Sequence, residues 1–229
     1  MRFLDQFEVV LLDMNGTFMF GHDRLGPEED FHRTYRAVGG RALDPSTVRA
    51  IMRATCDALQ VAYDDPAHFD DFPALREAFL RYGGAPLEEI EFLEQVFSSH
   101  ELGSCPPEHA GFLHRLAGTH SVGVVSNICA PPDAVETRLR DAGLDGVFTH
   151  TTFSSAGRSI KPSPGIFRRA LAAFPADSRV LFVGDSLDRD IRPARSLGLQ
   201  TAWIAPAGAA AREADVVIAS LPDLEAHTV

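Results

Sequence analysis

Polar side chains with the potential for catalysis follow the apolar segments of this sequence. They are carboxylates, hydroxyls, amides and one ammonium, namely Asp13, Asn15, Ser126, Asn127, Lys161, Asp185, Ser186 and Asp190. Ligands of an open parallel sheet bind beyond the carboxyl ends of its strands, so we expect these side chains to meet in one crevice. Oxygen ligands suit a divalent cation, and an ammonium suits a phosphoryl group. The pattern therefore predicts a site for a cation and a phosphate.

Continuous apolar runs predict the strands that position these side chains. The runs cover 8–13, 121–127, 179–185 and 200–205, with weaker ones at 146–153 and 214–221. Strands that are apolar on both faces are typical of a parallel sheet covered by helices. Helical patterns separate the runs at 131–143, 163–174 and 188–198. The alternation predicts a doubly wound, Rossmann-like α/β core formed by residues 1–19 and 105–229.

The segment 20–104 has a different pattern, without a convincing strand. Apolar residues recur at helical spacing in 45–65, 72–84 and 86–100, and Gly and Pro residues lie between these stretches. We expect a smaller, all-helical cap domain inserted directly after the first strand.

Composition excludes several classes of protein. The 229 residues include 45% hydrophobic ones, which is enough for a core domain and a smaller second domain. The formal net charge of -11 disfavours nucleic acid and anionic membranes as partners. Three widely spaced cysteines, Cys56, Cys105 and Cys129, predict neither a disulfide framework nor a zinc site. With no secretory signal pattern and no run of ~20 apolar residues, we expect a cytoplasmic protein, either a monomer or a homodimer.

Four motifs, in this order along the chain, resemble those of the haloacid dehalogenase-like (HAD) hydrolase superfamily. They are Asp13-Met14-Asn15-Gly16-Thr17, then Ser126, then Lys161-Pro162, then Gly184-Asp185-Ser186 with Asp190. Each motif alone is weak, but four in order at strand ends or in the following loops are specific. The resemblance covers essentially the whole chain, because the helical insert also lies where the family has its cap.

The resemblance implies that Asp13 is a nucleophile that attacks phosphorus and forms an aspartyl-phosphate. Lys161 would neutralise charge on Asp13 and on the phosphoryl oxygens. Ser126 and the Asn127 backbone would bind phosphoryl oxygens, and we expect Thr17 among the phosphate-binding residues as well. Ser126 and Asn127 also stand ahead of a predicted helix, so a simple capping role is the alternative.

The resemblance also implies Mg²⁺ as the cofactor. Its ligands would be the Asp13 carboxylate, the Asn15 backbone carbonyl and Asp185. Asp190 would hold a metal-bound water or orient Lys161. The alternative for Asp190 is a favourable position in the first turn of a helix.

Asn15 departs from the usual pattern, in which a second aspartate serves as general acid and base. An amide has no titrating proton, and losing this function slows reactions of poor leaving groups by roughly 10²–10⁴. Three outcomes follow: substrates with good leaving groups such as acyl or aryl phosphates, another proton donor such as His22, or phosphate binding with little turnover.

The sequence thus predicts an enzyme that hydrolyses a small phosphorylated metabolite with Mg²⁺. The alternatives are a catalytically weak phosphate-binding protein and a 2-haloacid dehalogenase. Dehalogenases also carry a non-acidic residue at the position of Asn15, but they usually lack the acids of the fourth motif. Asp185 and Asp190 therefore favour phosphoryl transfer. Arg24, His22 and Tyr63 are further candidates for contact with substrate, with packing or surface roles as the alternative.

Overall fold

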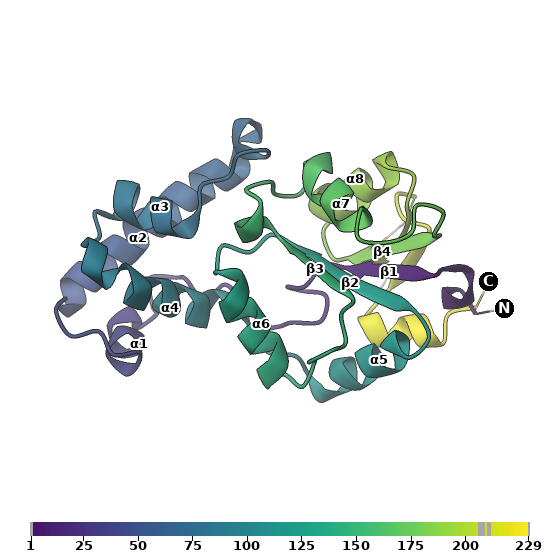
Figure 1. Ribbon diagram of the computed structural model, residues 1–229, viewed down its shortest axis with the longest axis horizontal. Helices are drawn as coiled ribbons and strands as arrows, with labels where there is room; N and C mark the ends of the chain where they lie inside the picture. Colours follow the sequence, from purple (N-terminus) through teal and green to yellow (C-terminus); the bar gives the residue numbers. More distant parts are fainter. Residues whose placement is uncertain (1, 206–208, 210–211, 229) are drawn as a thin grey trace.

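The computed structural model describes residues 2–205, 209 and 212–228 and contains a six-stranded parallel sheet (Figure 1). The strand order is β3-β2-β1-β4-β5-β6, and every neighbouring pair is parallel. The strands are β1 (Val9–Leu12), β2 (Ser121–Ser126), β3 (His150–Phe153), β4 (Val180–Gly184), β5 (Gln200–Ile204) and β6 (Val216–Ile218). The six apolar runs of the sequence correspond to these strands, and the predicted doubly wound α/β fold is confirmed.

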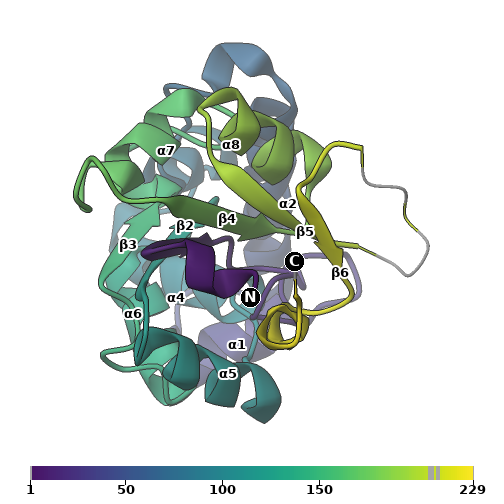
Figure 2. The ribbon, with the colours of Figure 1, turned by 90° about the vertical axis from the view of Figure 1, so that its right-hand side faces the viewer.

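Helices cover both faces of the sheet (Figure 2). One face carries α5 (Pro107–Ala117) and α6 (Pro132–Asp141), and the other carries α7 (Pro164–Leu171) and α8 (Arg192–Ser196). Alternate residues of β1 point to opposite faces: Val10 and Leu12 pack with α5 and α6, while Val9 and Leu11 pack with α7 and α8. Burial on both faces explains why the strand is uniformly apolar.

The helix boundaries follow local sequence signals. Proline occupies one of the first two positions of α5, α6, α7 and α8, where its missing N–H costs no hydrogen bond. The Ser163 side chain caps α7 by accepting a hydrogen bond from the Gly165 N–H. Gly143 follows α6 with a φ of 73°. A π turn at Leu187–Ile191 precedes α8, which shortens the helix predicted at 188–198.

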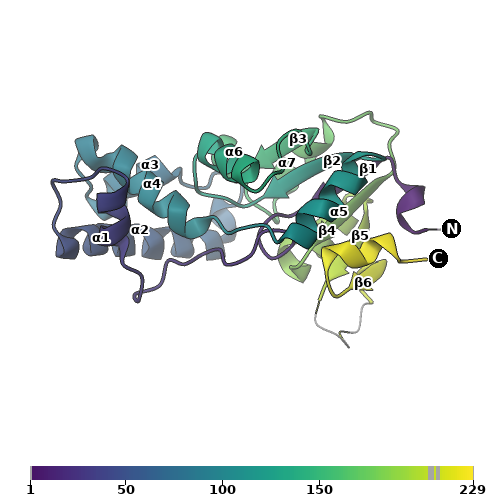
Figure 3. The same cartoon turned by 90° about the horizontal axis from the view of Figure 1, so that it is seen from below.

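A helical lobe, residues 31–101, lies beside the sheet rather than over one of its faces (Figures 1 and 3). Its helices are α1 (Phe31–Ala37), α2 (Pro45–Asp64), α3 (Leu75–Ala78) and α4 (Ile90–Glu101), with a π turn at Phe79–Gly83 and 3-10 turns at Pro66–His68 and Leu87–Glu89. The lobe has its own apolar core, which includes Tyr35, Met52, Phe79, Ile90 and Leu93. Neither α1 nor α5 is among the helices predicted from the sequence.

Two antiparallel connections join the helical lobe to the sheet. Phe20 and Ser104 exchange two backbone hydrogen bonds of 2.9 Å each. A Cβ atom on the neighbouring Gly103 would lie 2.3 Å from the Phe20 carbonyl oxygen, so glycine is required for this close approach. We propose that residues 20–104 form one domain and that residues 1–19 and 105–229 form the other. Among the described residues, no helix has both the length and the apolar character needed to cross a membrane.

A buried hydrogen-bond network in the lobe generates a stability prediction. The fully buried Tyr35 hydroxyl donates to the buried Glu89 carboxylate and accepts from the backbone N–H groups of Ala42 and Leu43 at 3.1 and 3.2 Å. Tyr35→Phe leaves these groups without their partner, so we expect it to lower the free energy of unfolding by about 1–3 kcal/mol. Urea unfolding monitored by circular dichroism measures the change. Tyr82→Phe, at an exposed tyrosine of the same lobe, is the matched control, and an equal effect in both variants would refute the network's role.

Candidate active site

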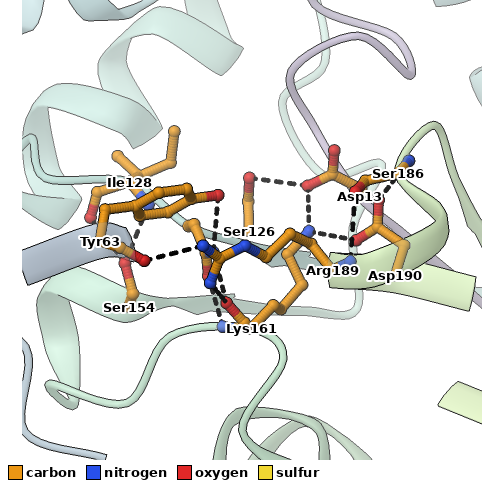
Figure 4. Close-up of polar contacts among 10 residues, drawn as sticks. Asp13, Tyr63, Ser126, Ile128, Ser154, Lys161, Ser186, Arg189 and Asp190 are labelled. Carbon is orange, nitrogen blue, oxygen red and sulfur yellow. Dashed lines mark hydrogen bonds and ion pairs between the residues drawn. The ribbon is translucent and has the colours of Figure 1, made fainter. Parts of the chain in front are cut away.

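The candidate site lies beyond the carboxyl ends of β1, β2 and β4 (Figure 4). Asp13 follows β1, Ser126 ends β2, and Asp190 lies in the π turn that follows β4. Lys161 reaches the same place from the loop ahead of α7. Parallel neighbours in the sheet bring these loops together, as the sequence predicts.

Lys161 forms the centre of the cluster. Its Nζ atom donates hydrogen bonds to Asp13 Oδ1 at 2.5 Å and to Asp190 Oδ1 at 2.6 Å, and its side chain is only 3% exposed. The Ser126 hydroxyl donates to the same Asp13 Oδ1 at 3.0 Å. Within the described residues no donor reaches Asp13 Oδ2. One oxygen of Asp13 is therefore held in place, and the other is free to react or to bind a cation.

Electrostatics keep the lysine charged. Burial opposes the charge, but the carboxylates of Asp13 and Asp190 outweigh it and raise the pKa of the Lys161 ammonium. Burial and the nearby Asp13 carboxylate raise the pKa of Asp190, although Lys161 acts in the opposite direction. Burial and Asp13 likewise raise the pKa of Asp185. The single ammonium does not balance three carboxylates.

The three carboxylates form a donor set that fits a divalent cation. Asp13, Asp185 and Asp190 each offer an oxygen, and these oxygens lie within 4.8 Å of one another. Three carboxylates and one ammonium sum to a charge of -2 when all are ionised, which a divalent cation would balance. Hard oxygen ligands of this kind are typical of Mg²⁺. The Asn15 amide oxygen is also buried without a hydrogen-bond partner.

Two glycines allow the carboxylates to approach the backbone. A Cβ atom on Gly16 would lie 2.2 Å from Asp185 Oδ2, and one on Gly184 would lie 2.5 Å from Asp190 Oδ2. Gly16 also has a φ of 80°, which other residues rarely adopt. These positions explain why glycine accompanies the acids in the first and fourth motifs.

The Asn127 side chain braces the lysine loop. Its Nδ2 donates to the Lys161 carbonyl at 3.0 Å, and its Oδ1 accepts from the Lys161 N–H at 2.7 Å. Helix α6 begins only at Pro132 and has no side-chain cap, so Ser126 and Asn127 do not cap it. Thr17 is fully buried, its hydroxyl has no hydrogen-bond partner, and no hydrogen bond joins it to the cluster in the described structure.

No pattern in the sequence indicates the contact that connects the helical lobe to this cluster. The Arg189 guanidinium lies 4.0 Å from the centre of the Tyr63 ring and 4.8 Å from that of Phe69. It also donates to the Tyr63 carbonyl at 2.7 Å and to the Lys161 carbonyl at 2.9 Å (Figure 4). Arg189 stands inside the fourth motif, but only the fold reveals that its partners belong to α2 and the turn after it.

Two other residues predicted as substrate contacts lie in the chain segment that leads into the helical lobe. Arg24 donates to the Ser99 carbonyl at 2.7 Å and so binds the lobe. His22 Nε2 lies 3.7 Å from the Asp23 carboxylate, while its Nδ1 is buried without a partner. The hydrogen bonds of the described residues join neither side chain to Asp13.

The three cysteines carry no sign of nucleophilic chemistry. All are free, and burial raises the pKa of Cys56 to about 12 and that of Cys105 to about 11. Burial and the Glu101 carboxylate raise the pKa of Cys129 as well. Protonated thiols are poor nucleophiles and poor metal ligands.

A cavity of about 450 Å³ lies beside the cluster, between the helical lobe and the sheet. Its lobe side includes Tyr63 and Glu101, and its sheet side includes Asn127 and Ile128. This volume lies within the range of about 300–1,000 Å³ that is usual for small-molecule sites. Since Asn127 braces Lys161 and lines the cavity, the two features are contiguous.

Parts of this sequence resemble known proteins. Residues 160–224 match a family model described as "HAD-hyrolase-like". Among curated proteins, the phosphoserine phosphatase of Thermus thermophilus is 32% identical over 130 residues, which are 56% of this chain and 52% of that protein. The chain thus matches about half the length of this relative.

Solved structures resemble the chain over almost its whole length. A HAD phosphatase from Thermococcus onnurineus has a TM-score of 0.63 and 23% identity and covers 96% of both chains. A 2-haloacid dehalogenase from Pseudomonas syringae pv. Tomato has a TM-score of 0.65 and 22% identity and covers 96% of this chain and 98% of that one. At such identities the structures show a shared fold. Residues 160–224 therefore resemble the haloacid dehalogenase-like hydrolases in sequence, and the chain shares their fold over almost its whole length.

Proposed function

We propose that this protein is a Mg²⁺-dependent phosphatase that acts on a small phosphorylated metabolite and uses Asp13 as its nucleophile. The observation that carries the proposal is the Lys161 ammonium, which binds both Asp13 and Asp190 beside the carboxylate of Asp185. A purely structural ion pair would not require the third acid, which is exposed. Curated relatives with phosphatase names support the same class of reaction.

Asp13 Oδ2 is the oxygen proposed to attack phosphorus. A bond forms between this oxygen and phosphorus, and the bond from phosphorus to the leaving oxygen breaks, with its electrons going to the leaving group. Lys161 and Ser126 hold Asp13 Oδ1, so the carboxylate is oriented with its second oxygen free to attack. Water then attacks the aspartyl-phosphate, releases phosphate and restores Asp13.

The proposed Mg²⁺ ligands are the carboxylates of Asp13 and Asp185 and the backbone carbonyl of Asn15, with Asp190 close by. The bound cation would remove the repulsion between the anionic nucleophile and an anionic phosphate. Asp190 already accepts hydrogen bonds from Lys161 and from the Ser186 N–H, so we assign it chiefly to orienting the lysine. Ser126 and the Asn127 backbone are proposed to bind phosphoryl oxygens. Thr17 stays a prediction, because its hydroxyl is fully buried.

The helical lobe is proposed as the cap that covers the site and selects the substrate. It contacts the cluster through Arg189, and the cavity lies between the lobe and the sheet. Closing such a cap excludes water during the first step. Asn15 cannot protonate a leaving oxygen, so we propose substrates with good leaving groups.

A substrate panel tests the reaction and the role of Asn15. We expect Mg²⁺-dependent hydrolysis of acetyl phosphate and p-nitrophenyl phosphate, with alkyl esters slower by roughly 10²–10⁴. Asn15→Asp should raise alkyl-ester hydrolysis and leave acetyl phosphate hydrolysis within a few-fold, because only the former needs a proton donor. Asp13→Asn should abolish both activities. Phosphate binding with no turnover across the panel would overturn the enzyme proposal, and metal-independent halide release from 2-haloacids would favour a dehalogenase.

Metal binding can be measured separately from turnover. Because the cluster has excess negative charge, we expect Mg²⁺ to raise the melting temperature of the wild-type protein and to bind in a calorimetric titration. Asp185→Asn should weaken Mg²⁺ binding at least about tenfold, since it removes one charged ligand. Asp188→Asn, at an exposed acid three residues away, is the matched control. Equal Mg²⁺ affinity in both variants and the wild type would contradict the proposed ligands.

A further inference from the structure

The cavity beside the proposed active site has an acidic and aromatic lining. Three carboxylates, those of Asp23, Asp57 and Glu101, contribute to it, and no lysine or arginine is among the described lining residues. The aromatic wall consists of Tyr63, Phe72 and Phe97. Acids with aromatic rings form the usual surroundings of an ammonium group, whereas a second carboxylate or phosphate would be repelled.

Glu101 is the buried member of this lining. Its side chain is only 5% exposed, and its two oxygens accept the backbone N–H groups of Cys129 and Ala130, both at 2.7 Å. No cationic side chain lies within ion-pair distance of it in the described structure. Burial raises the pKa of Glu101 to about 7 despite these two donors. Buried carboxylates are normally paired with a cation, so a ligand cation in the cavity would supply the missing partner.

The charged groups nearest to the cavity are already engaged elsewhere. Arg24 donates to the Ser99 carbonyl, and Arg189 is held by backbone carbonyls and the two rings described above. Arg53 lies 3.8 Å from Asp57, but both side chains are about 70% exposed, so this pair contributes little. His22 lies 3.7 Å from the Asp23 carboxylate. Among the described lining residues, no lysine, arginine or histidine balances the three carboxylates.

Position determines which part of a substrate would occupy this cavity. Asn127 lines the cavity and also forms hydrogen bonds with the backbone of Lys161. Tyr63 lines the cavity as well, and its hydroxyl oxygen lies 3.4 Å from the Asn127 amide nitrogen. Asn127 also follows Ser126, whose hydroxyl donates to Asp13 Oδ1, so the cavity adjoins the end of the site that holds the proposed nucleophile. A leaving group that extends from a phosphoryl group at Asp13 toward Asn127 would enter the cavity.

We infer that the cavity recognises a positively charged amine on the leaving group, so that the substrate is a phosphorylated compound bearing an ammonium. This inference rests on the proposed phosphatase function and names the class of substrate. The phosphoryl end would meet Lys161 and the proposed cation, and the ammonium end would meet Glu101, Asp57 and Asp23 with the aromatic wall.

Three aryl phosphates of similar size test the inference, because they share a good leaving group and differ in charge. They are 4-(aminomethyl)phenyl phosphate, 4-ethylphenyl phosphate and 4-(carboxymethyl)phenyl phosphate. We expect kcat/KM for the cationic compound to exceed that of the neutral one by roughly tenfold, and the anionic compound to be the poorest. Equal values for the cationic and neutral compounds, or a preference for the anionic one, would overturn the inference while leaving the phosphatase proposal intact.

Variants assign the preference to the cavity. Asp57→Asn and Asp23→Asn should each lower the ratio of cationic to neutral kcat/KM by roughly threefold, mainly through KM. Asn tolerates the positive φ of 53° at Asp23, so this change preserves the backbone. Glu88→Gln removes an exposed acid of the lobe outside the cavity and should leave the ratio unchanged. If Asp57→Asn and Asp23→Asn lower the ratio no more than Glu88→Gln does, the cavity is not the source of the preference for a cation.

Binding measurements test this inference independently of the proposed reaction. If no phosphate ester or acyl phosphate is hydrolysed, the proposed function fails, and calorimetry with 4-(aminomethyl)benzylphosphonate and 4-ethylbenzylphosphonate still tests the cavity. Tighter binding of the aminomethyl compound, weakened by Asp57→Asn, would support a cation site without catalysis. Equal binding of the two phosphonates would overturn it.

Discussion

The arrangement of the proposed active site depends on one buried ammonium group, that of Lys161. Lys161 binds Asp13 and Asp190, two carboxylates of like charge that would repel each other without it. Removing a partner from such a buried set leaves an uncompensated charge, which is strongly destabilising. The ammonium therefore fixes both the orientation of the proposed nucleophile and the position of the fourth-motif acid. The remaining negative charge of the cluster is the basis of the proposed cation site.

The sheet topology makes this interaction possible. Strand β1 lies between β2 and β4, so the loops after these three strands open at the same edge. The lysine arrives from a fourth loop, which the Asn127 side chain ties to the end of β2. Arg189 then extends the network from the lysine loop to the helical lobe. Arg189 thus connects the backbone of helix α2 in the lobe to the backbone that carries Lys161.

The strands of the sheet and most residues of the charged cluster could be predicted from the sequence alone. Apolar runs are a strong signal when both strand faces are buried, and parallel strands bring their carboxyl ends to one edge by geometry alone. Helix α1 is short, and the apolar pattern of the sequence did not predict it. The interaction of Arg189 with Tyr63 could not be predicted from the sequence either. Arg189 and Tyr63 are 126 residues apart, and their contact depends on how the lobe packs. The acidic lining of the cavity likewise comes from distant segments such as α2 and the end of α4.

Direct detection of phosphoryl transfer to Asp13 tests the central claim. The protein is mixed with Mg²⁺ and acetyl phosphate, quenched in acid within one turnover, and digested with pepsin for peptide mass analysis. We expect one phosphoryl group on the peptide that contains Asp13, located on that residue, and none in Asp13→Asn. Turnover with no phosphoryl group on Asp13, or with the group on another residue, would contradict it.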